Sequence, residues 1–437
     1  MTMGELIEPR VLKGFRDFLP DKETERLAII GKLGQVFRLF GFSPIDTPVL
    51  EYAEVLLGKG GGETDKQVYR FTDNGGREVA LRYDLTVPFA RFMAAHLAEL
   101  PVPFKRWHAA KVWRGENTQR GRYREFVQVD FDIVGADSAA ADLEILLLMR
   151  ESMRTLGTGR FTIRFAHRGV FNAFLARLGE QEHSVEILRA MDKERKIGRE
   201  KTRELLEGIA GTTHAERVLA FSSLGDSFGE TLEGLAEAAG ADCEGVQRLV
   251  EIGRCLEQMG DRDAFVLDPS ITRGLDYYTG IVFETFLTDL PEIGSVCSGG
   301  RYNDLASLYT KQKLPGVGAS IGLDRLMAAR EELGLSAAGP SAGAVLVALL
   351  DEKLLGGCQG IASAFRAAGI PADVYPEKKK LAVQFAWAEK KGIPLAVLYG
   401  GEESATGLVG LKDLRTRQGF DGLTIESAIE KAKALLR

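Results

Sequence analysis

The sequence lacks the features that mark membrane, secreted and zinc-bound proteins. No apolar run reaches the length of a transmembrane helix, and Met1–Gly14 lacks the apolar core of a signal peptide. The four cysteines stand far apart and form no CxxC pair, so we expect no structural zinc, no metal site built from protein residues alone and no disulfide framework. Unpaired cysteines fit a reducing compartment, so we expect a cytoplasmic protein with no membrane partner.

The chain also lacks an excess of basic charge. Its 56 Lys and Arg residues face 62 Asp and Glu residues, and the net charge of −6 gives no global sign of a nucleic-acid partner. The composition is that of a globular protein, with 45% hydrophobic and 27% charged residues. Because 437 residues exceed one typical core, we expect two or three domains.

Local patterns divide the chain into five segments. Residues 1–169 and 263–334 carry strand-like runs and are expected to share one sheet, whereas residues 170–262 have helical patterns typical of an insertion between strands. Residues 335–343 are rich in Gly, Pro and Ser and predict a linker. Residues 344–437 alternate strand and helix, which predicts a small α/β domain with a mostly parallel sheet. That segment has 13 Lys and Arg residues against 11 Asp and Glu, which permits an anionic partner.

Single elements can also be placed. Glu23–Phe40 has apolar residues at helical spacing and is followed by Gly41, so a helix is expected there. Phe42–Leu50 predicts a strand, and its two prolines place it at a sheet edge. Within the helical segment, Leu188–Leu206 shows the clearest helix pattern.

The strongest local signal is a basic loop. Arg114–Arg124 lies between two strand-like runs and is expected to form a long hairpin. Arg114 at its base and Arg122 on its return can clamp a triphosphate, because guanidinium forks match phosphate oxygens. Phe126 could stack on a nucleobase, and Glu116 could read its exocyclic amine. The alternative is a surface hairpin whose arginines serve solubility.

Polar side chains alternate along the strand that follows. A period of two places Gln128, Asp130 and Asp132 on one face. Together with Asp84 they would be costly to bury without a polar ligand, and they could bind a cationic amino group and an imidazole. The alternative is an outward-facing sheet edge.

Two glycine-rich segments carry different predictions. Gly316–Leu323 predicts a strand against which a ligand can lie close, and Arg325 follows at a helix start, where the dipole favours phosphate. The alternative is that Arg325 pairs with a carboxylate. Gly58–Glu63 resembles a phosphate loop but lacks the GK[ST] ending that opens a helix. We expect a mobile loop over a site there, or a plain connector.

The stretch Ile271–Glu284 gathers unusual chemistry. It places Arg273, Asp276, Tyr277 and Tyr278 at the entrance to a β-branched and aromatic strand, a rigid place to hold reactive groups. The alternative is a tyrosine-rich turn before a core strand.

In this order, the segments resemble the three motifs of the class II aminoacyl-tRNA synthetases. The helix Glu23–Phe40 with the strand at Pro48 is similar to motif 1, the dimer-interface element. Trp113–Asp132 resembles motif 2, and Gly318–Arg325 resembles motif 3.

Two further segments are more specific. Arg273–Tyr278 (RGLDYY) and Ser298–Leu305 (SGGRYNDL) resemble the two motifs peculiar to the histidyl-tRNA synthetase family. The resemblance implies an α+β catalytic domain with an antiparallel sheet flanked by helices, a helical insertion and a C-terminal α/β anticodon-binding-type domain, where Gly410–Leu414 also looks familial.

The resemblance also implies a ligase that acts in two steps. L-histidine and ATP, with Mg²⁺, give histidyl-adenylate and pyrophosphate, and the histidyl group then passes to the 3′-terminal adenosine of tRNA(His). A homodimer formed through the motif 1 region is implied as well.

Roles of single residues follow from the resemblance by position. Arg273 and Arg114 would be catalytic: Arg273 would neutralise charge as the histidine carboxylate attacks the α-phosphate, which Arg114 would bind. Histidine would be bound by Asp84, Leu85, Thr86, Gln128, Asp132, Arg273, Tyr277 and Tyr278, with Asp132 fixing the imidazole tautomer. ATP would be bound by Arg114, Glu116, Arg122, Phe126 and Arg325. Contacts to tRNA would come from Gln119 and Arg120.

Two alternatives share the catalytic fold. One is a non-catalytic paralog that acts as the regulatory subunit of ATP phosphoribosyltransferase; it usually lacks the C-terminal domain and the arginine at position 273, and this chain has both. The other is a ligase that adenylates histidine without charging tRNA, against which the insertion and the C-terminal domain argue.

Replacing Arg273 tests its implied role. In Arg273→Ala we expect most adenylation to be lost while histidine affinity stays within about tenfold, because a cation placed for the transition state contributes less to ground-state binding. Histidine-dependent ATP–pyrophosphate exchange and a histidine titration measure the two effects. Retained exchange activity in Arg273→Ala would contradict the catalytic role implied for Arg273. Arg273→His is a weaker test, because histidine is partly cationic near its pKa.

Overall fold

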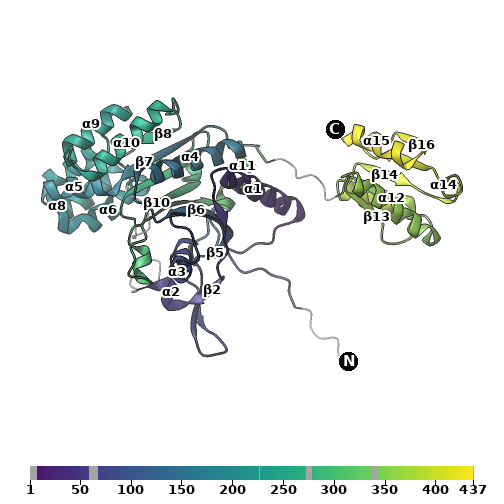
Figure 1. The fold of residues 1–437 in the computed structure, drawn as a ribbon, viewed down its shortest axis with the longest axis horizontal. Coiled ribbons are helices and arrows are strands. Elements are labelled where there is room, and N and C mark those ends of the chain that lie inside the picture. The colour runs from purple at the N-terminus through teal and green to yellow at the C-terminus, as the bar shows by residue number, and fades with distance from the viewer. Residues whose placement is uncertain (1–6, 59–66, 226, 272–277, 337–342, 437) are drawn as a thin grey trace. The chain divides into compact units, whose positions relative to one another are not determined.

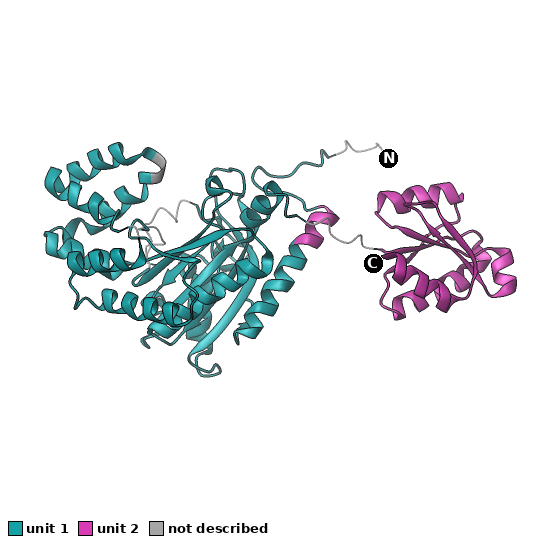
Figure 2. Cartoon of the chain, turned by 90° about the horizontal axis from the view of Figure 1, so that it is seen from above, with its two compact units in different colours: residues 1–18, 26–336 teal, residues 19–25, 337–437 magenta. Residues whose placement is uncertain are grey.

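The computed structural model describes residues 7–58, 67–225, 227–271, 278–336 and 343–436 (Figure 1). Two compact units are distinguished, residues 1–18 with 26–336 and residues 19–25 with 337–437 (Figure 2). Within the described ranges, every helix is too short or too polar to cross a membrane.

An eight-stranded sheet forms the centre of the larger unit. Its inner six strands are antiparallel neighbours, as expected, whereas the short edge strands β1 and β8 pair in parallel. In spatial order the strands are β1 (Ser43–Pro44), β5 (Phe104–Trp113), β6 (Glu125–Val134), β11 (Gly316–Gly322), β10 (Cys297–Arg301), β9 (Ile281–Leu287), β7 (Phe161–His167) and β8 (Phe265–Leu267).

Long helices cover one face of this sheet. They are α1 (Pro20–Leu39), α4 (Ala139–Leu156) and α11 (Leu323–Glu332). Leu33 and Phe37 of α1 are fully buried, and the Phe37 ring centroid lies 5.1 Å from that of Phe131 on β6. Each such side chain stabilises the fold by about 1.5–3 kcal/mol when buried. The helix predicted at Glu23–Phe40 is confirmed, and the odd-numbered residues of β6 face this core.

One end of the opposite face is covered by further elements. There, α2 (Ala53–Leu57), α3 (Thr86–His96) and a small sheet surround a second apolar cluster. The small sheet has the order β2 (Leu50–Tyr52), β4 (Glu78–Leu81) and β3 (Arg70–Thr72). The edge position predicted for Phe42–Leu50 is confirmed, and the segment is divided between β1 at the edge of the large sheet and β2 at the edge of the small one. Pro44 and Pro48 cannot donate ladder hydrogen bonds, which prevents one continuous strand.

All described elements between β7 and β8 are helical. They are α5 (Arg168–Leu178), the short 3₁₀ turn Gln181–His183, α6 (Ser184–Asp192), α7 (Glu194–Ile197), α8 (Arg199–Phe221), α9 (Phe228–Ala239) and α10 (Glu244–Gln258). The helical pattern predicted at Leu188–Leu206 is confirmed, and the segment is divided among α6, α7 and α8. Gly198 has φ +84° and ψ 159°, a conformation open to glycine that separates α7 from α8.

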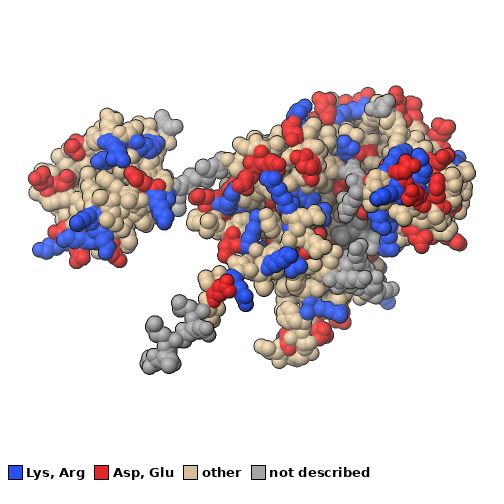
Figure 3. Space-filling model, turned by 180° about the vertical axis from the view of Figure 1, so that it is seen from behind, with Lys and Arg blue, Asp and Glu red and all other residues tan. Residues whose placement is uncertain are grey.

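The smaller unit has a five-stranded sheet with helices packed on it. Its strands in order are β13 (Ala372–Val374), β12 (Val345–Val347), β14 (Leu395–Leu398), β15 (Val409–Asp413) and β16 (Gly419–Leu423), and its helices are α12 (Leu355–Ala367), α13 (Leu381–Lys390), α14 (Gly401–Thr406) and α15 (Ile425–Leu436). The predicted parallel arrangement holds only for β13, β12 and β14, because β15 and β16 pair antiparallel. On the face in Figure 3, basic side chains lie beside acidic ones over both units.

Candidate active site

A cleft of about 1890 Å³ opens on the sheet face opposite the long helices. Strand register brings a row of polar residues across this face, with Asp130 beside Ser320, Ser320 beside Ser298, and Ser298 beside Glu284. The β5–β6 hairpin, the start of α3 and the first turn of α11 contribute the remaining polar lining. The cleft therefore joins segments far apart in the sequence.

Most of the predicted site residues line this cleft, namely Asp84, Thr86, Arg114, Glu116, Arg122, Phe126, Gln128, Tyr278 and Arg325. Leu85 and Asp132 are buried beneath it. Gln119 and Arg120 are exposed on the hairpin, and Arg120 forms an ion pair with Glu332 at 3.1 Å. Arg273, Tyr277 and most of the loop at Gly58–Glu63 lie outside the described residues.

One end of the cleft is strongly basic. Arg114 Nη1 and Arg122 Nη1 lie 3.8 and 3.6 Å from the two carboxylate oxygens of Glu116. Arg325 Nη1 donates to the carbonyl oxygen of Ser295 at 2.6 Å. Burial, followed by the charge of Arg122, lowers the pKa of Arg325 to about 10. Three guanidinium groups thus gather here beside the carboxylates of Glu116 and Glu284, and their forked donors suit the oxygens of a polyanion such as a triphosphate.

Arg114 is also held by its own neighbours. Its Nε donates to the carbonyl oxygen of Tyr83 at 2.9 Å, and its guanidinium carbon lies 5.2 Å from the ring centroid of Phe126. A guanidinium fixed in this way keeps its remaining N–H groups directed at a ligand, which reduces the entropy lost on binding.

Beneath the other end lies a buried ion pair. Arg106 is fully buried, and its Nη2 lies 2.8 Å from Asp132 Oδ2 and 3.8 Å from Asp130 Oδ2. The Tyr302 hydroxyl donates to Asp132 Oδ1 at 2.5 Å. Gln128 Nε2 donates to Ser320 Oγ at 2.7 Å. Asp132 and Gln128, which the sequence predicts to bind a ligand, are thus already bonded to other protein side chains.

Arg106 and Tyr302 are two members of this polar group that sequence reasoning missed. Arg106 stands opposite Asp132 in the β5–β6 register, and the Leu85 carbonyl oxygen accepts from its Nη2 at 3.3 Å. In the sequence it is only one member of a basic run. Tyr302 belongs to SGGRYNDL, but only the antiparallel pairing of β11 with β6 brings Tyr302, next to Gly316, close to Asp132.

The glycines of β11 make room for protein side chains. A Cβ added at Gly318 would lie 1.9 Å from Asp132 Oδ1, and one at Gly316 would lie 2.3 Å from the Tyr302 ring. The prediction that these glycines admit a ligand is therefore wrong for Gly316 and Gly318. Gly322 lines the cleft, and a Cβ added there would lie 3.9 Å from the Arg325 Cβ, an ordinary contact distance. The prediction therefore stands for Gly322.

Burial changes the ionisation of this group. Desolvation raises the pKa of Asp130 from its ordinary 3.8 to about 7 and also raises the pKa of Asp132, while Arg106 opposes both shifts. Desolvation and the charges of Arg106 and Arg82 lower the pKa of His108 to about 4. The Arg106 guanidinium thus faces the carboxyl groups of Asp132 and Asp130, and near neutral pH the Asp130 carboxyl is only partly ionised.

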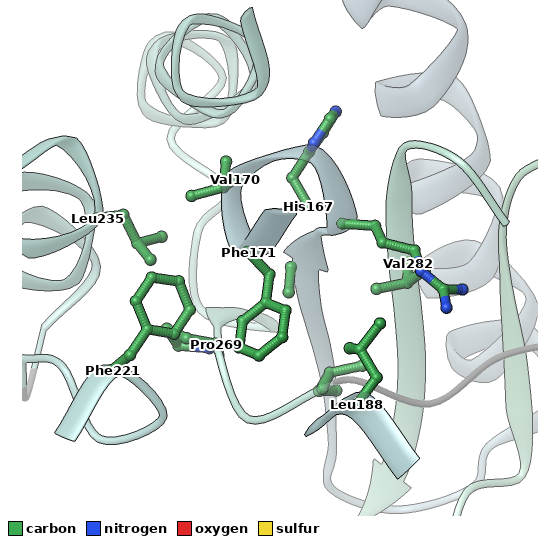
Figure 4. Close-up of a pocket in the computed structure, with 11 residues that line it drawn as sticks. His167, Val170, Phe171, Leu188, Phe221, Leu235, Pro269 and Val282 are labelled. Atoms are coloured by element: carbon green, nitrogen blue, oxygen red, sulfur yellow. The ribbon is translucent and has the colours of Figure 1, made fainter. Parts of the chain in front are cut away.

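A separate, small apolar cavity lies between β7, β9 and the helices that follow β7 (Figure 4). Phe171 and Phe221 meet there edge to face, with ring centroids 5.4 Å apart, and Leu235 and Val282 line it as well. Its walls are mostly carbon, so it does not suit a triphosphate or a zwitterion.

Comparison with known proteins agrees over nearly the whole chain. Residues 14–326 match the family model described as histidyl-tRNA synthetase, and residues 344–435 match that of the anticodon binding domain. A histidine–tRNA ligase of Treponema denticola is 49% identical over 446 residues, 99% of each chain. One of Rhodopirellula baltica is 47% identical over 95% of this chain and 96% of its own.

Solved structures agree with this. A crystal structure of histidyl-tRNA synthetase from Nostoc sp. PCC 7120 has a TM-score of 0.86 at 30% identity and covers 98% of this chain and 100% of its own. A structure from Bacillus halodurans, described as an ATP phosphoribosyltransferase regulatory subunit/histidyl-tRNA synthetase, has a TM-score of 0.73 at 23% identity over 87% of this chain and 96% of its own. That second likeness shows the fold alone.

The closeness of Gly318 to Asp132 gives a testable prediction. In Gly318→Ala the added methyl displaces the Asp132 carboxylate from Arg106 and Tyr302, so we expect a loss of about 1–3 kcal/mol in stability together with weaker histidine binding. Denaturant unfolding and a histidine titration measure the two effects. Gly208→Ala is the matched control, because no atom lies within 4 Å of a Cβ at that helical position. Unchanged histidine binding in Gly318→Ala would contradict the assignment of Asp132.

The raised pKa of Asp130 predicts a pH dependence of stability. The folded state holds this proton up to about pH 7, whereas the unfolded chain releases it near 3.8, so this contribution is lost as the pH rises through 7. In Asp130→Asn, which cannot ionise, we expect a shallower fall in Tm between pH 5 and 8 than in the wild type. Thermal unfolding across that range tests the point, and parallel curves for the two proteins would refute it.

Proposed function

The chain belongs to the histidyl-tRNA synthetase family, and we propose that its cleft activates L-histidine with ATP and transfers the histidyl group to tRNA(His). One observation carries the proposal: a basic end made by three arginines lies in the same cleft as residues above a buried carboxylate, Asp132. Activation of an amino acid requires this combination, a polyanion site beside a site for a polar side chain.

ATP enters as its Mg²⁺ complex at the basic end. Arg114 binds the α-phosphate and the histidine carboxylate, and Arg325 takes the far end of the triphosphate together with Arg122. Phe126 and Glu116 hold the adenine by stacking and by accepting from its amine. The Mg²⁺ ion is part of this substrate.

Histidine lies above the buried ion pair. Asp84, at the start of α3, and Thr86 hold the α-amino group, and Gln128 and Tyr278 line the pocket. By the resemblance to the family, Tyr277 would contact histidine as well. Asp132 reads the imidazole and fixes its tautomer, while Leu85 supports the site by its carbonyl bond to Arg106.

The first step joins two bound substrates. A carboxylate oxygen of histidine attacks the α-phosphorus, a new O–P bond forms, and the bond to the β-phosphate oxygen breaks to release pyrophosphate. Arg114 and Arg273 offset the negative charge that develops, so catalysis consists of positioning and electrostatic stabilisation. In the second step the ribose hydroxyl of the terminal adenosine takes the histidyl group, and AMP leaves.

The remaining parts serve the tRNA and the assembly. Residues 1–169 and 263–334 form the catalytic domain, residues 170–262 the insertion, and residues 344–437, after the 335–343 linker, bind the anticodon region. Gln119 and Arg120 on the hairpin contact the acceptor stem. Two copies associate through the motif 1 region around α1, and the protein works in the cytoplasm.

The regulatory paralog is disfavoured. Relatives named as histidine–tRNA ligases cover 95–99% of this chain at 47–49% identity, and the likeness to the Bacillus halodurans structure is limited to the fold.

One experiment separates the possible activities. We expect histidine-dependent ATP–pyrophosphate exchange and, with tRNA(His) added, formation of histidyl-tRNA in a filter-binding assay. A protein without exchange would be a regulator, and exchange without charging would indicate a ligase that does not use tRNA. A parallel reaction with another amino acid in place of histidine controls for specificity.

A further inference from the structure

The segment Lys13–Phe18, here called the arm, packs against the β5–β6 hairpin. The Gly14 carbonyl oxygen accepts from the backbone N–H of Arg124 at 2.8 Å. Gly14 has φ +88°, and a Cβ there would lie 2.7 Å from Arg124 Cγ and 2.9 Å from Thr118 Cγ2. The arm and the hairpin therefore approach each other so closely that only glycine fits between them.

Arg16 of the arm contacts two elements at the basic end of the cleft. Its guanidinium carbon lies 3.8 Å from the ring centroid of Tyr123 on the hairpin and 4.4 Å from that of Phe18. The same guanidinium forms an ion pair with Asp324, in the first turn of α11. Asp324 is buried, and its Oδ2 accepts from the backbone N–H of Val127 at 2.7 Å. One side chain thus links the hairpin return, the start of β6 and the start of α11.

The two arginines assigned to the triphosphate are adjacent in sequence to the residues that Arg16 contacts. Arg122 precedes Tyr123, and Arg325 follows Asp324. A Cβ at Gly121 would lie 3.3 Å from the Arg325 Cα atom, so the hairpin rests directly on α11. Arg122 and Arg325 carry like charges and repel each other, so the separation of the two elements must be fixed by other contacts.

We propose that Arg16 is a positioning residue for the ATP site: by joining Tyr123 to Asp324, it fixes the spacing of Arg122 and Arg325 before the triphosphate binds. The inference rests on the proposed function, because it assumes that these two arginines bind ATP. It assigns a role to a residue outside the three motifs, and it makes the arm a part of the nucleotide site.

Arg16→Ala removes both contacts. We expect kcat/KM for ATP in pyrophosphate exchange to fall by about tenfold or more, because displacement of a binding group by a fraction of an ångström weakens a preorganised site, while KM for histidine stays within about twofold. Arg16→Lys keeps the ion pair with Asp324 but loses the planar stacking on Tyr123, so it should recover part of the loss. Arg10→Ala is the matched control, because Arg10 lies just before the arm and its side chain is 83% exposed.

A double-mutant cycle distinguishes positioning from general stability. If Arg16 acts through the arginine spacing, Arg16→Ala weakens ATP binding much less in an Arg122→Ala background than in the wild type. ATP dissociation constants from a fluorescence titration give this coupling without requiring catalysis. Additive effects, equal losses for ATP and histidine, or a lowered Tm with normal ATP binding would each overturn the proposal.

The same titration separates the two levels of the argument. A wild-type protein that binds ATP but shows no exchange contradicts the proposed function and leaves the role of Arg16 open to measurement in the cycle. Normal exchange together with unchanged ATP binding in both Arg16 variants overturns the inference alone.

Discussion

A buried charge on the open face of the sheet determines much of the catalytic unit. Arg106 and Asp132 are withdrawn from water, and a lone charge at either position would be strongly destabilising. The neighbouring strands are adapted to the pair: β11 carries glycine where Asp132 and Tyr302 need space, and the turn before α3 turns the Leu85 carbonyl toward Arg106. The pocket above is therefore shaped by the requirement to hold this ion pair.

The basic end of the cleft follows a different rule. Its three arginines lie close enough to repel one another, although Glu116 contacts two of them and Glu284 acts on the third, Arg325. Rigid contacts around them, such as the bond from Arg114 to the Tyr83 carbonyl and the arm packed on the hairpin, resist this repulsion. The cleft thus combines a partly paired polar floor with a wall that carries three arginines.

Local patterns in the sequence predict several elements that form the cleft. The helix at Glu23–Phe40, the basic hairpin and the alternation in Gln128–Asp132 are visible because each depends on a short period or a short loop. The break at Gly198 is harder to predict, because a glycine within a helical pattern can adopt either helical or non-helical dihedral angles. The antiparallel pairing of β15 and β16 and the role of Arg106 depend on which strands become neighbours. The space that Gly318 leaves for Asp132 depends on the same long-range register, which no local period encodes.

The crossover between β7 and β8 has a consequence for how this architecture can diverge. The helices from Arg168 to Gln258 leave the sheet from one strand and return to its parallel neighbour at the edge. The ladder of the inner six strands does not depend on their number or length, and the entropy of closing so long an excursion grows only slowly with added residues. Relatives can therefore enlarge, trim or replace this module while the floor of the cleft keeps its register, which makes the edge of the sheet a natural place for new recognition surfaces to evolve.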